Sequence, residues 1–259
     1  MIYLEQGMVL PAVATAQLLL RQSKPYATID CTGRFDAFMR VAVVHFQKHH
    51  KVITDGCIGK DNWDRLLAPK KLQTIDVVDG TDPNLIDFEV KDIRKQGGDP
   101  IVLFGCSNGV QELVRAVKAK ARGEGSIALL RIHGHGGEGN QGVSSGAANG
   151  QRHLAGISDE NFGTTGAQLA MLQSLMCPYG SVQLLGCSVG GGAKGKSLVN
   201  KLTQSFGVPV TAAVQIQFGG GRKTFTFEGP TVTGCPGGVD LKTWAAGIQA
   251  RYDNFAIAV

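Results

Sequence analysis

Two glycine-rich segments carry the residues of this sequence that are best suited to catalysis. The first, RIHGHGGEGNQG at residues 131–142, holds His133 and His135 with one residue between them. The second, LLGCSVGGG, holds Cys187. A neighbouring imidazole can generate a thiolate, which is the nucleophilic form of cysteine. Glycines let the backbone approach a substrate carbonyl and present N–H groups to it. The residue types therefore allow a cysteine nucleophile that a histidine activates.

The elements that must position these segments are strands and helices in alternation. Five apolar runs have the composition of buried strands: TIDVV, IVLFG, SIALLRI, SVQLLG and VPVTAAV. Three helical patterns lie between several of them: VQELVRAVKAKA, GAQLAMLQSLM and KGKSLVNKLTQSF. This alternation predicts an α/β fold, a mainly parallel sheet with helices on both faces. Ligands of such sheets bind at the carboxyl ends of the strands. Both glycine-rich segments directly follow a predicted strand, so we expect them at that edge.

The first seventy residues have a different pattern, in which helices alternate with glycine-containing turns. Phe38, Ala42 and Phe46 recur every four residues, so they fall on one face of a predicted helix. The sequence therefore predicts two domains, a small helical domain at residues 1–69 and the α/β domain at residues 70–259.

The overall composition narrows the class of protein. The chain has 259 residues, of which 43% are apolar, as in a water-soluble globular protein. Its net charge of +5 is spread along the chain, so no nucleic-acid-binding patch is indicated. The six cysteines include no CxxC pair, which argues against structural zinc and against a dense disulfide framework. We expect neither a cofactor nor a bound metal.

The start of the chain, MIYLEQGMVLPAVATAQLLLRQS, is apolar but lacks the basic residues that open a signal peptide. It is better interpreted as an amphipathic first helix. No other run approaches the length of a membrane span. We therefore expect no signal peptide and no membrane span. The expected location is the cytoplasm, or the cell envelope after export by a signal-independent route.

The stretch GRFDAFMRVAVVHFQKHHKVITDGCIGKDNWDRLL resembles the peptidoglycan-binding-like domain that is attached to many cell-wall hydrolases. The positions that match the spacing of that family are Phe35, Ala42, Val43, Phe46, Gln47, Asp55, Gly56, Ile58, Gly59, Trp63 and Leu66. The chain departs from the family pattern at Thr32, Asp36 and Met39. The resemblance implies a helical fold and makes peptidoglycan a candidate partner. A helical docking module is the alternative.

The segment LLRIHGHGGEGNQG, followed about fifty residues later by VQLLGCSVGGGAKGKSLVNKLTQSFGVPVTAAV, resembles the caspase-like cysteine peptidases of the caspase, gingipain and metacaspase group. The resemblance covers approximately residues 70–238. It implies a hydrolase of protein or peptide substrates, such as a bacterial effector at the cell envelope. His135, with glycine on both sides, corresponds to the base and Cys187 to the nucleophile. The backbone N–H groups of Gly136 and Cys187 would bind the oxyanion. His133 is the second candidate histidine.

Four alternatives stay open. His133 and His135 could form a metal clip, although a third ligand is missing. The segment GGGAKGKS at residues 190–197 is similar to a phosphate-binding loop. The helix start FGCSNGVQELVRAV resembles the NlpC/P60 peptidoglycan peptidases, with Cys106 as nucleophile and His153 as its histidine. A caspase-like domain can also serve as a non-catalytic interaction module.

Overall fold

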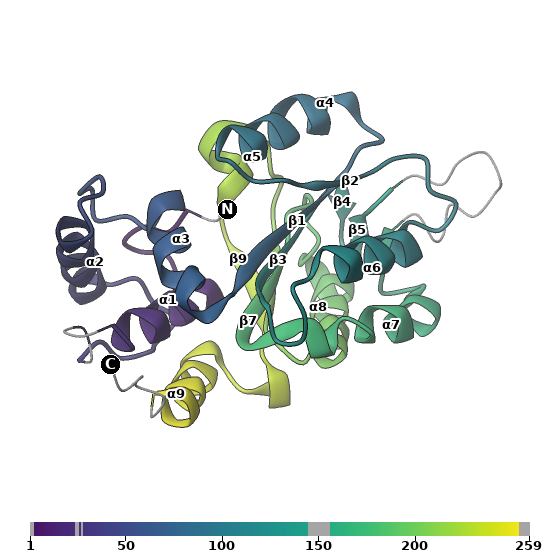
Figure 1. The fold of residues 1–259 in the computed structure, drawn as a ribbon. Helices are drawn as coiled ribbons and strands as arrows, with labels where there is room; N and C mark the ends of the chain where they lie inside the picture. Colours follow the sequence, from purple (N-terminus) through teal and green to yellow (C-terminus); the bar gives the residue numbers. More distant parts are fainter. Residues whose placement is uncertain (1–2, 24–25, 27, 145–155, 254–259) are drawn as a thin grey trace.

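The computed structural model describes residues 3–23, 26, 28–144 and 156–253, and it has the predicted α/β architecture (Figure 1). The helices of the N-terminal region are α1 (Pro11–Arg21), α2 (Ala37–His49), α3 (Lys60–Leu67) and the short 3-10 helix η1 (Ala68–Lys70). Asp36 and Met39, two of the positions that depart from the peptidoglycan-binding pattern, form the start of α2. The Asp36 carboxylate accepts a hydrogen bond from the Met39 N–H at 2.9 Å, which caps this helix.

The centre of the molecule is a six-stranded sheet of mainly parallel strands, as predicted. Its strands are β1 (Gln73–Asp79), β2 (Ile101–Leu103), β3 (Ile127–His133), β7 (Met176–Leu184), β8 (Val210–Ala213) and β9 (Thr231–Gly234). Their order in the sheet is β2-β1-β3-β7-β8-β9. The first five strands run parallel, and β9 pairs antiparallel with β8 at one edge.

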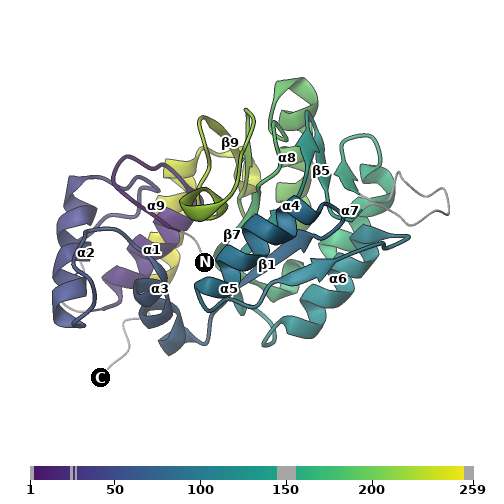
Figure 2. The same ribbon diagram turned by 90° about the horizontal axis from the view of Figure 1, so that it is seen from above.

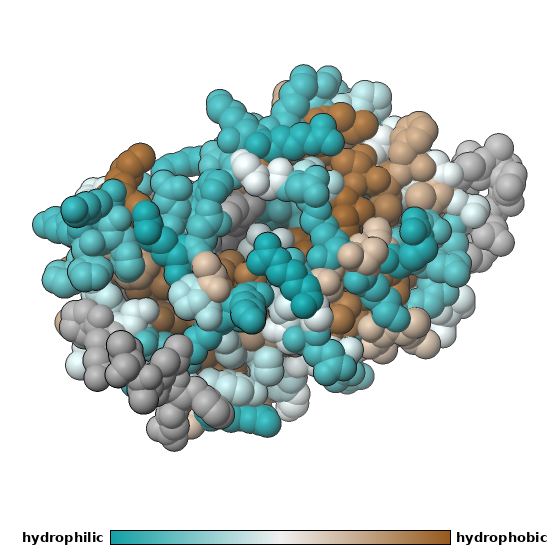
Figure 3. Space-filling view, viewed as in Figure 1, coloured by the Kyte–Doolittle hydropathy of each residue, from teal (hydrophilic) through white to brown (hydrophobic). Residues whose placement is uncertain are grey.

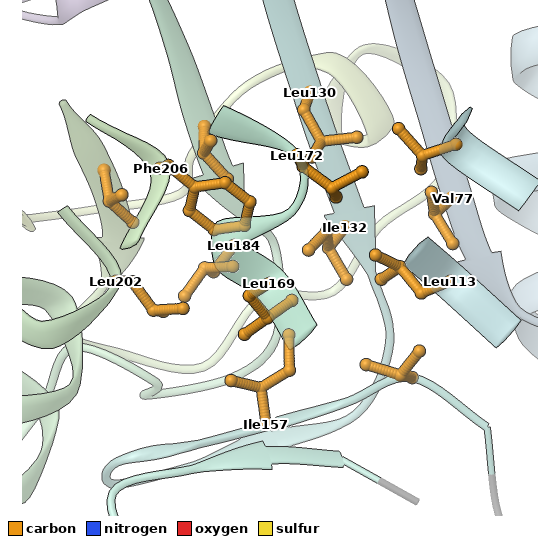
Figure 4. Close-up of a cluster of buried hydrophobic side chains, with 14 of the residues drawn as sticks. Val77, Leu113, Leu130, Ile132, Ile157, Leu169, Leu172, Leu184, Leu202 and Phe206 are labelled. Carbon is orange, nitrogen blue, oxygen red and sulfur yellow. The ribbon is translucent and has the colours of Figure 1, made fainter. Parts of the chain in front are cut away.

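One face of this sheet carries the main hydrophobic core. It is covered by the helices α6 (Gly109–Lys120), α7 (Phe162–Ala170) and α8 (Gly192–Phe206). Because side chains alternate between the two faces of a strand, Leu130 and Ile132 of β3 both point into this core. They meet Leu113 of α6, Leu169 of α7 and Phe206 of α8 there (Figure 4).

The opposite face is covered near its carboxyl end by one helical segment, residues 83–95. It consists of α4 (Pro83–Leu85), the π-helix η2 (Ile86–Val90) and α5 (Lys91–Lys95) (Figure 2). The 3-10 helix η5 (Gly221–Phe225) lies against it. Val90 and Ile93 of the segment pack on Val78 of β1 and on Phe225 of η5. The sheet therefore has helices on both faces, which confirms the predicted fold class.

The N-terminal helices pack directly on the amino ends of the central strands. Ala128 and Leu129 of β3 and Cys177 of β7 belong to the same apolar cluster as Leu19 and Leu20 of α1. The expected domain boundary after residue 69 falls within η1, between the N-terminal helices and β1. The two regions share this cluster rather than meeting only through a linker.

The last helix, α9 (Leu241–Tyr252), also lies against α1 (Figure 1). Trp244 and Ile248 of α9 pack on Leu18 of α1. The Arg21 guanidinium at the end of α1 donates from Nε to Asp253 Oδ1 at 3.0 Å. The beginning and the end of the described chain are therefore fastened to one another.

A small three-stranded antiparallel sheet stands at the carboxyl edge of the large sheet. Its strands are β4 (Gly136–Gly137), β5 (Asn140–Gly142) and β6 (Gly156–Ser158). The remaining 3-10 helices are η4 (Gln173–Leu175) and η6 (Pro236–Gly238). The first glycine-rich segment thus forms most of the small sheet.

The surface is polar over most of the face seen in Figure 3, with a hydrophobic area between α4 and the edge strand β2. Phe104, which follows β2, is a large apolar side chain that is 72% exposed. In the part of the chain that the structure describes, no helix combines the length and the apolar character that crossing a bilayer requires.

The shared cluster leads to a prediction about stability. Deleting residues 1–69 exposes Ala128, Leu129 and Cys177, and each re-exposed large apolar side chain costs about 1.5–3 kcal/mol. We expect the truncated chain to unfold at a clearly lower urea concentration than the full chain, as followed by circular dichroism. Phe38→Ala removes a side chain that is 85% exposed and should leave the midpoint unchanged. Equal midpoints for the truncated and full chains would contradict the prediction.

Candidate functional site

The two glycine-rich segments meet at the carboxyl edge of the large sheet. β3 and β7 are neighbours, and Ile132 lies opposite Leu184 in their register. The segments that follow these strands are in backbone contact at Gly136 and Cys187. A Cβ atom at Gly136 would lie 2.9 Å from the Cys187 nitrogen and 2.8 Å from its carbonyl oxygen. Only glycine leaves room for this approach, so the residue after His135 packs on the peptide groups of Cys187.

The buried side chain of Gln141 fixes the two segments to each other. Its Oε1 accepts a hydrogen bond from the Gly186 N–H at 3.0 Å, and its Nε2 donates to the Gly142 carbonyl at 2.9 Å. The Gly142 N–H in turn donates to the His135 carbonyl at 2.7 Å. Because Gln141 is fully buried, both of its amide ends need these partners. These hydrogen bonds therefore fix the backbone of His135 relative to that of Cys187.

His135 is oriented by a carboxylate from a third segment. Its side chain is 70% exposed, and its Nε2 lies 2.7 Å from Asp82 Oδ2. The other oxygen of Asp82 accepts the Asn84 N–H at 2.8 Å and caps α4. The Asn84 backbone, and after it His135, lower the pKa of Asp82. Because a carboxylate only accepts hydrogen bonds, Nε2 carries the proton and Nδ1 is the nitrogen that can act as a base.

Cys187 is half-buried, and its thiol contacts the loop between β8 and β9. The Gln217 N–H donates to Sγ at 3.3 Å, and Sγ lies 3.3 Å from the Gln217 carbonyl oxygen. Within the described residues, no hydrogen bond joins the side chains of Cys187 and His135. The structure thus brings their backbones together while each side chain has another partner.

The residue after Cys187 has a strained backbone. Ser188 has φ of 56°, in the left-handed region that residues other than glycine seldom adopt. Two hydrogen bonds hold it there, from the Ser188 N–H to the Gln215 carbonyl at 2.9 Å and from the Gly191 N–H to the Ser188 carbonyl at 2.8 Å. The sharp turn leaves Cys187 at the edge of the sheet before α8 begins. Strain of this kind is concentrated at functional sites.

His133 lies in a different environment from His135. It is fully buried, with Nε2 3.2 Å from Asp76 Oδ1 and Nδ1 2.7 Å from Glu89 Oε2. Asp76 is also 2.5 Å from Nε of the fully buried Arg131. Both ring nitrogens of His133 are therefore engaged with carboxylates, and the geometry favours His135 as the histidine available to Cys187.

The buried charged groups around His133 shift one another's pKa values. Burial opposes its charged form, but the attraction of Glu89 and the hydrogen bond with Asp76 outweigh burial and raise the pKa of His133. Burial would likewise raise the pKa of Asp76, but the charge of Arg131 and the bond with His133 hold it well below its usual range. With His133 protonated, two cations face two carboxylates, so the buried group is neutral.

An open cleft of about 950 Å³ lies beside His135. Its lining includes the acidic residues Asp79, Asp82, Glu138 and Glu160 and the basic residue Lys194. Lys194 pairs with Glu160 at 2.6 Å. Glu138 occupies the start of α8, because a Cβ atom at Gly192 would lie 2.7 Å from its Oε2. A carboxylate at this helix terminus takes the place that a phosphate-binding loop would offer to phosphate, which disfavours the nucleotide interpretation of residues 190–197.

The surroundings of the other cysteines make them less suitable as nucleophiles than Cys187. Cys106 lies in the loop before α6, two residues ahead of the cap residue Asn108. His153, its expected partner, is outside the described residues. Burial raises the pKa of Cys177 and of Cys235 to about 11, so both are poor nucleophiles near neutral pH. In the described part of the chain, no three His, Cys, Asp or Glu side chains are grouped so as to hold a metal ion.

The sequence interpretation missed Asp82 and Glu89. A signal for Asp82 was present, since TDPN follows the predicted strand TIDVV at the same edge as His135 and has the form of a helix start. Glu89 had no comparable signal. It lies in a charged amphipathic stretch, and only the tertiary structure turns it toward His133.

Two family models match the chain. The model described as "Putative peptidoglycan binding domain" matches residues 10–66, which confirms the peptidoglycan-binding part of the predicted resemblance. The model described as "Domain of unknown function (DUF4347)" matches residues 85–221, which are 137 of the 259 residues. The second match includes His133, His135 and Cys187. No curated protein and no solved structure matches the chain.

The raised pKa of His133 predicts how the stability of the fold depends on pH. Its raised pKa means that the folded chain binds this proton more tightly than the unfolded chain. The stabilisation is complete below the unfolded value of about 6.5 and is lost as the pH rises through the higher folded value.

We therefore expect the free energy of unfolding to fall as the pH rises above about 6.5, as measured by urea denaturation. His133→Gln should reduce this dependence, whereas His49→Gln, at an exposed position on α2, should retain it. The same slope in all three proteins would refute this origin of the pH dependence.

Proposed function

The chain belongs to the family described as Domain of unknown function (DUF4347), and we propose that it is a caspase-like cysteine peptidase with Cys187 as nucleophile and His135 as general base. The backbone contact between Gly136 and Cys187 carries this proposal. It gives the histidine segment and the cysteine segment a fixed relation at the edge where parallel sheets bind ligands. The peptidoglycan-binding domain at residues 10–66 would bring the peptidase to the cell wall.

The side chains can reach each other without movement of the backbone. From the contact of Gly136 with the Cys187 nitrogen, the Cα atoms of His135 and Cys187 lie within about 10 Å of each other. The proposal requires that rotation of the half-buried thiol away from Gln217 closes that gap while His135 keeps its contact with Asp82. Catalytic hydrogen bonds are often long in unliganded enzymes and tighten only when substrate binds.

The reaction would follow the general course of cysteine peptidases. Nδ1 of His135 accepts the thiol proton, and Sγ of Cys187 attacks the carbonyl carbon of the scissile peptide bond. Asp82 holds the ring and stabilises the imidazolium that forms. The imidazolium then gives its proton to the leaving amine, and water hydrolyses the thioester to release the acid and free Cys187. Among the described residues, the Cys187 N–H has no hydrogen-bond acceptor, so it is available to the oxyanion together with Gly136.

The NlpC/P60-like alternative is less well supported. That resemblance rests on Cys106 at the start of a helix, but Cys106 precedes the first residue of α6, Gly109, by three positions. The cysteine is followed by parallel strands and helices rather than by a β-rich half. A non-catalytic interaction module is the second alternative. Only a measurement of peptide hydrolysis distinguishes it from the peptidase.

We predict that Cys187→Ala abolishes hydrolysis of a peptide library read by mass spectrometry. The substitution removes a small side chain, so the far-ultraviolet circular dichroism should remain that of the wild type. Cys106→Ala is the matched control at another half-buried cysteine and should retain full activity. Loss of activity in Cys106→Ala with activity retained in Cys187→Ala would transfer the role of nucleophile to Cys106.

His135→Ala tests the general base. We expect kcat/KM to fall about 10²–10⁴-fold, the range for loss of a general base. The exposed side chain contributes little packing, so the urea midpoint should not change. A variant with nearly wild-type kcat/KM would exclude His135 as the base.

The peptidoglycan-binding domain offers a groove of about 780 Å³ for its ligand. Its lining includes Tyr26, Ile29 and the exposed Phe38 and Val41. Aromatic and aliphatic side chains of this kind can pack on the apolar faces of sugar rings and peptide stems.

We expect Phe38→Ala to weaken co-sedimentation of the full chain with isolated sacculi. The control is Ile53→Ala, because Ile53 is also a large apolar side chain, 77% exposed, but lies outside the groove. Equal losses in both variants, or none in Phe38→Ala, would rule out this groove as the binding surface.

A further inference from the structure

We propose that Glu89 is a positioning residue for His135, because its ion pair with His133 fixes the helical segment that presents Asp82. The proposal rests on the peptidase function proposed above. It assigns a role to the buried His133, which the catalytic steps do not use.

The two histidines bind the same segment of chain. Asp82 caps residues 83–95 and contacts Nε2 of His135 at 2.7 Å, and Glu89 within that segment contacts Nδ1 of His133 at 2.7 Å. Asp82 and Glu89 are seven residues apart, at the cap of this segment and within its π-helix. The histidines stand on the end of one strand and its continuation. One rigid strand end therefore binds the helical segment at two points.

Glu89 is the first buried side chain after Asp82, and Leu85 before it is partly buried against the apolar cluster of Val90. None of residues 81–88 is buried, whereas Glu89 is 5% exposed and Val90 is 1% exposed. Val90 packs in an apolar cluster, which holds the segment on the sheet but specifies its register only loosely. The ion pair of Glu89 with His133 joins two particular buried atoms, Oε2 and Nδ1, at 2.7 Å, so it ties one position of the segment to one position of the strand. The ion pair thus fixes the chain after Asp82, while hydrogen bonds from the Gly80 N–H to the Leu103 carbonyl and from the Thr81 N–H to Asp79 Oδ1 hold the chain before it.

The π-helix brings Glu89 inward. Residues 86–90 form η2, in which Asp87 and Phe88 are exposed and Glu89 and Val90 are buried. A π-turn holds one residue more than an α-turn, and such turns occur frequently at functional sites. The extra residue rotates the following side chains relative to α4. It lets one short segment present Asp82 to the exposed His135 and Glu89 to the buried His133.

The consequence for chemistry concerns the tautomer of His135. Asp82 favours the form with the proton on Nε2, which leaves Nδ1 free to take the thiol proton. Displacing Asp82 by about 1 Å would weaken this preference, and such a displacement can lower a rate up to about 100-fold. Because the effect acts on the base and not on substrate contacts, kcat should fall while KM stays nearly constant.

The test compares Glu89→Ala, Asp82→Ala and the double variant in the full chain. The control is Asp87→Ala, on the same segment but exposed and paired with Lys91 at 2.9 Å. The first readout is the tautomer of His135 at alkaline pH, from long-range ¹H–¹⁵N correlations. We expect Glu89→Ala and Asp82→Ala to lower the population of the Nε2–H form, and Asp87→Ala to leave it unchanged.

The second readout is kcat. We expect Glu89→Ala to lower it by up to about 100-fold and the double variant to lose no more than Asp82→Ala alone, because both changes break the same contact. Glu89→Gln, which keeps the shape of the side chain, supplies the measurement if Glu89→Ala fails to fold. Multiplying losses, or a tautomer unchanged in the Glu89 variants, would overturn the proposal.

The two readouts separate this inference from the peptidase assignment. A wild-type chain that cleaves no peptide would refute the proposed function, while the tautomer of His135 would still decide whether Glu89 positions Asp82. Conversely, an active wild type with a Glu89 variant of unchanged tautomer and kcat would refute only the positioning role.

Discussion

The buried ion pair between Arg131 and Asp76 is the contact on which the carboxyl edge of the sheet depends. Arg131 is fully buried, and a guanidinium without a partner would be very costly in that position. The register of β1 and β3 places Asp76 directly opposite Arg131. A slip of one strand by one residue would turn its charged side chain toward the apolar core on the other face and leave the other charge without its partner. The pair therefore fixes the alignment of the two strands whose ends carry Asp82, His133 and His135.

The same pair extends toward the site through His133. Asp76 contacts both Arg131 and His133, and His133 in turn pairs with Glu89. Alternation along β3 places Arg131 and His133 on the face opposite Leu130 and Ile132. One strand thus contributes every second side chain to the hydrophobic core and the others to a charged group beneath the helical segment 83–95.

Local sequence was sufficient to predict the five parallel strands and the convergence of the segments around His135 and Cys187, but not the edge strand β9 or the small sheet. Those features follow from apolar runs and from the alternation of strands and helices, which short stretches encode. Asp82 was within reach, because it follows a predicted strand at the same edge. Glu89 was not, since its inward orientation depends on a π-helix and on a histidine 44 positions later in the chain. The packing of α9 on α1 likewise joins segments that are far apart in the sequence, and the local pattern of neither segment predicts this contact.

The N-terminal helices pack on the amino ends of β3 and β7, whereas Cys187 lies at the carboxyl ends. β3 has seven residues, so these two ends are about 20 Å apart. A wall strand held by the N-terminal helices would leave the cysteine edge uncovered and directed away from its anchor. Anchoring would then raise the local concentration of the protein at the wall without presenting the anchoring polymer to the thiol. If the proposed function holds, this arrangement suits a tethered enzyme whose reach extends outward, toward polypeptides that pass near the wall.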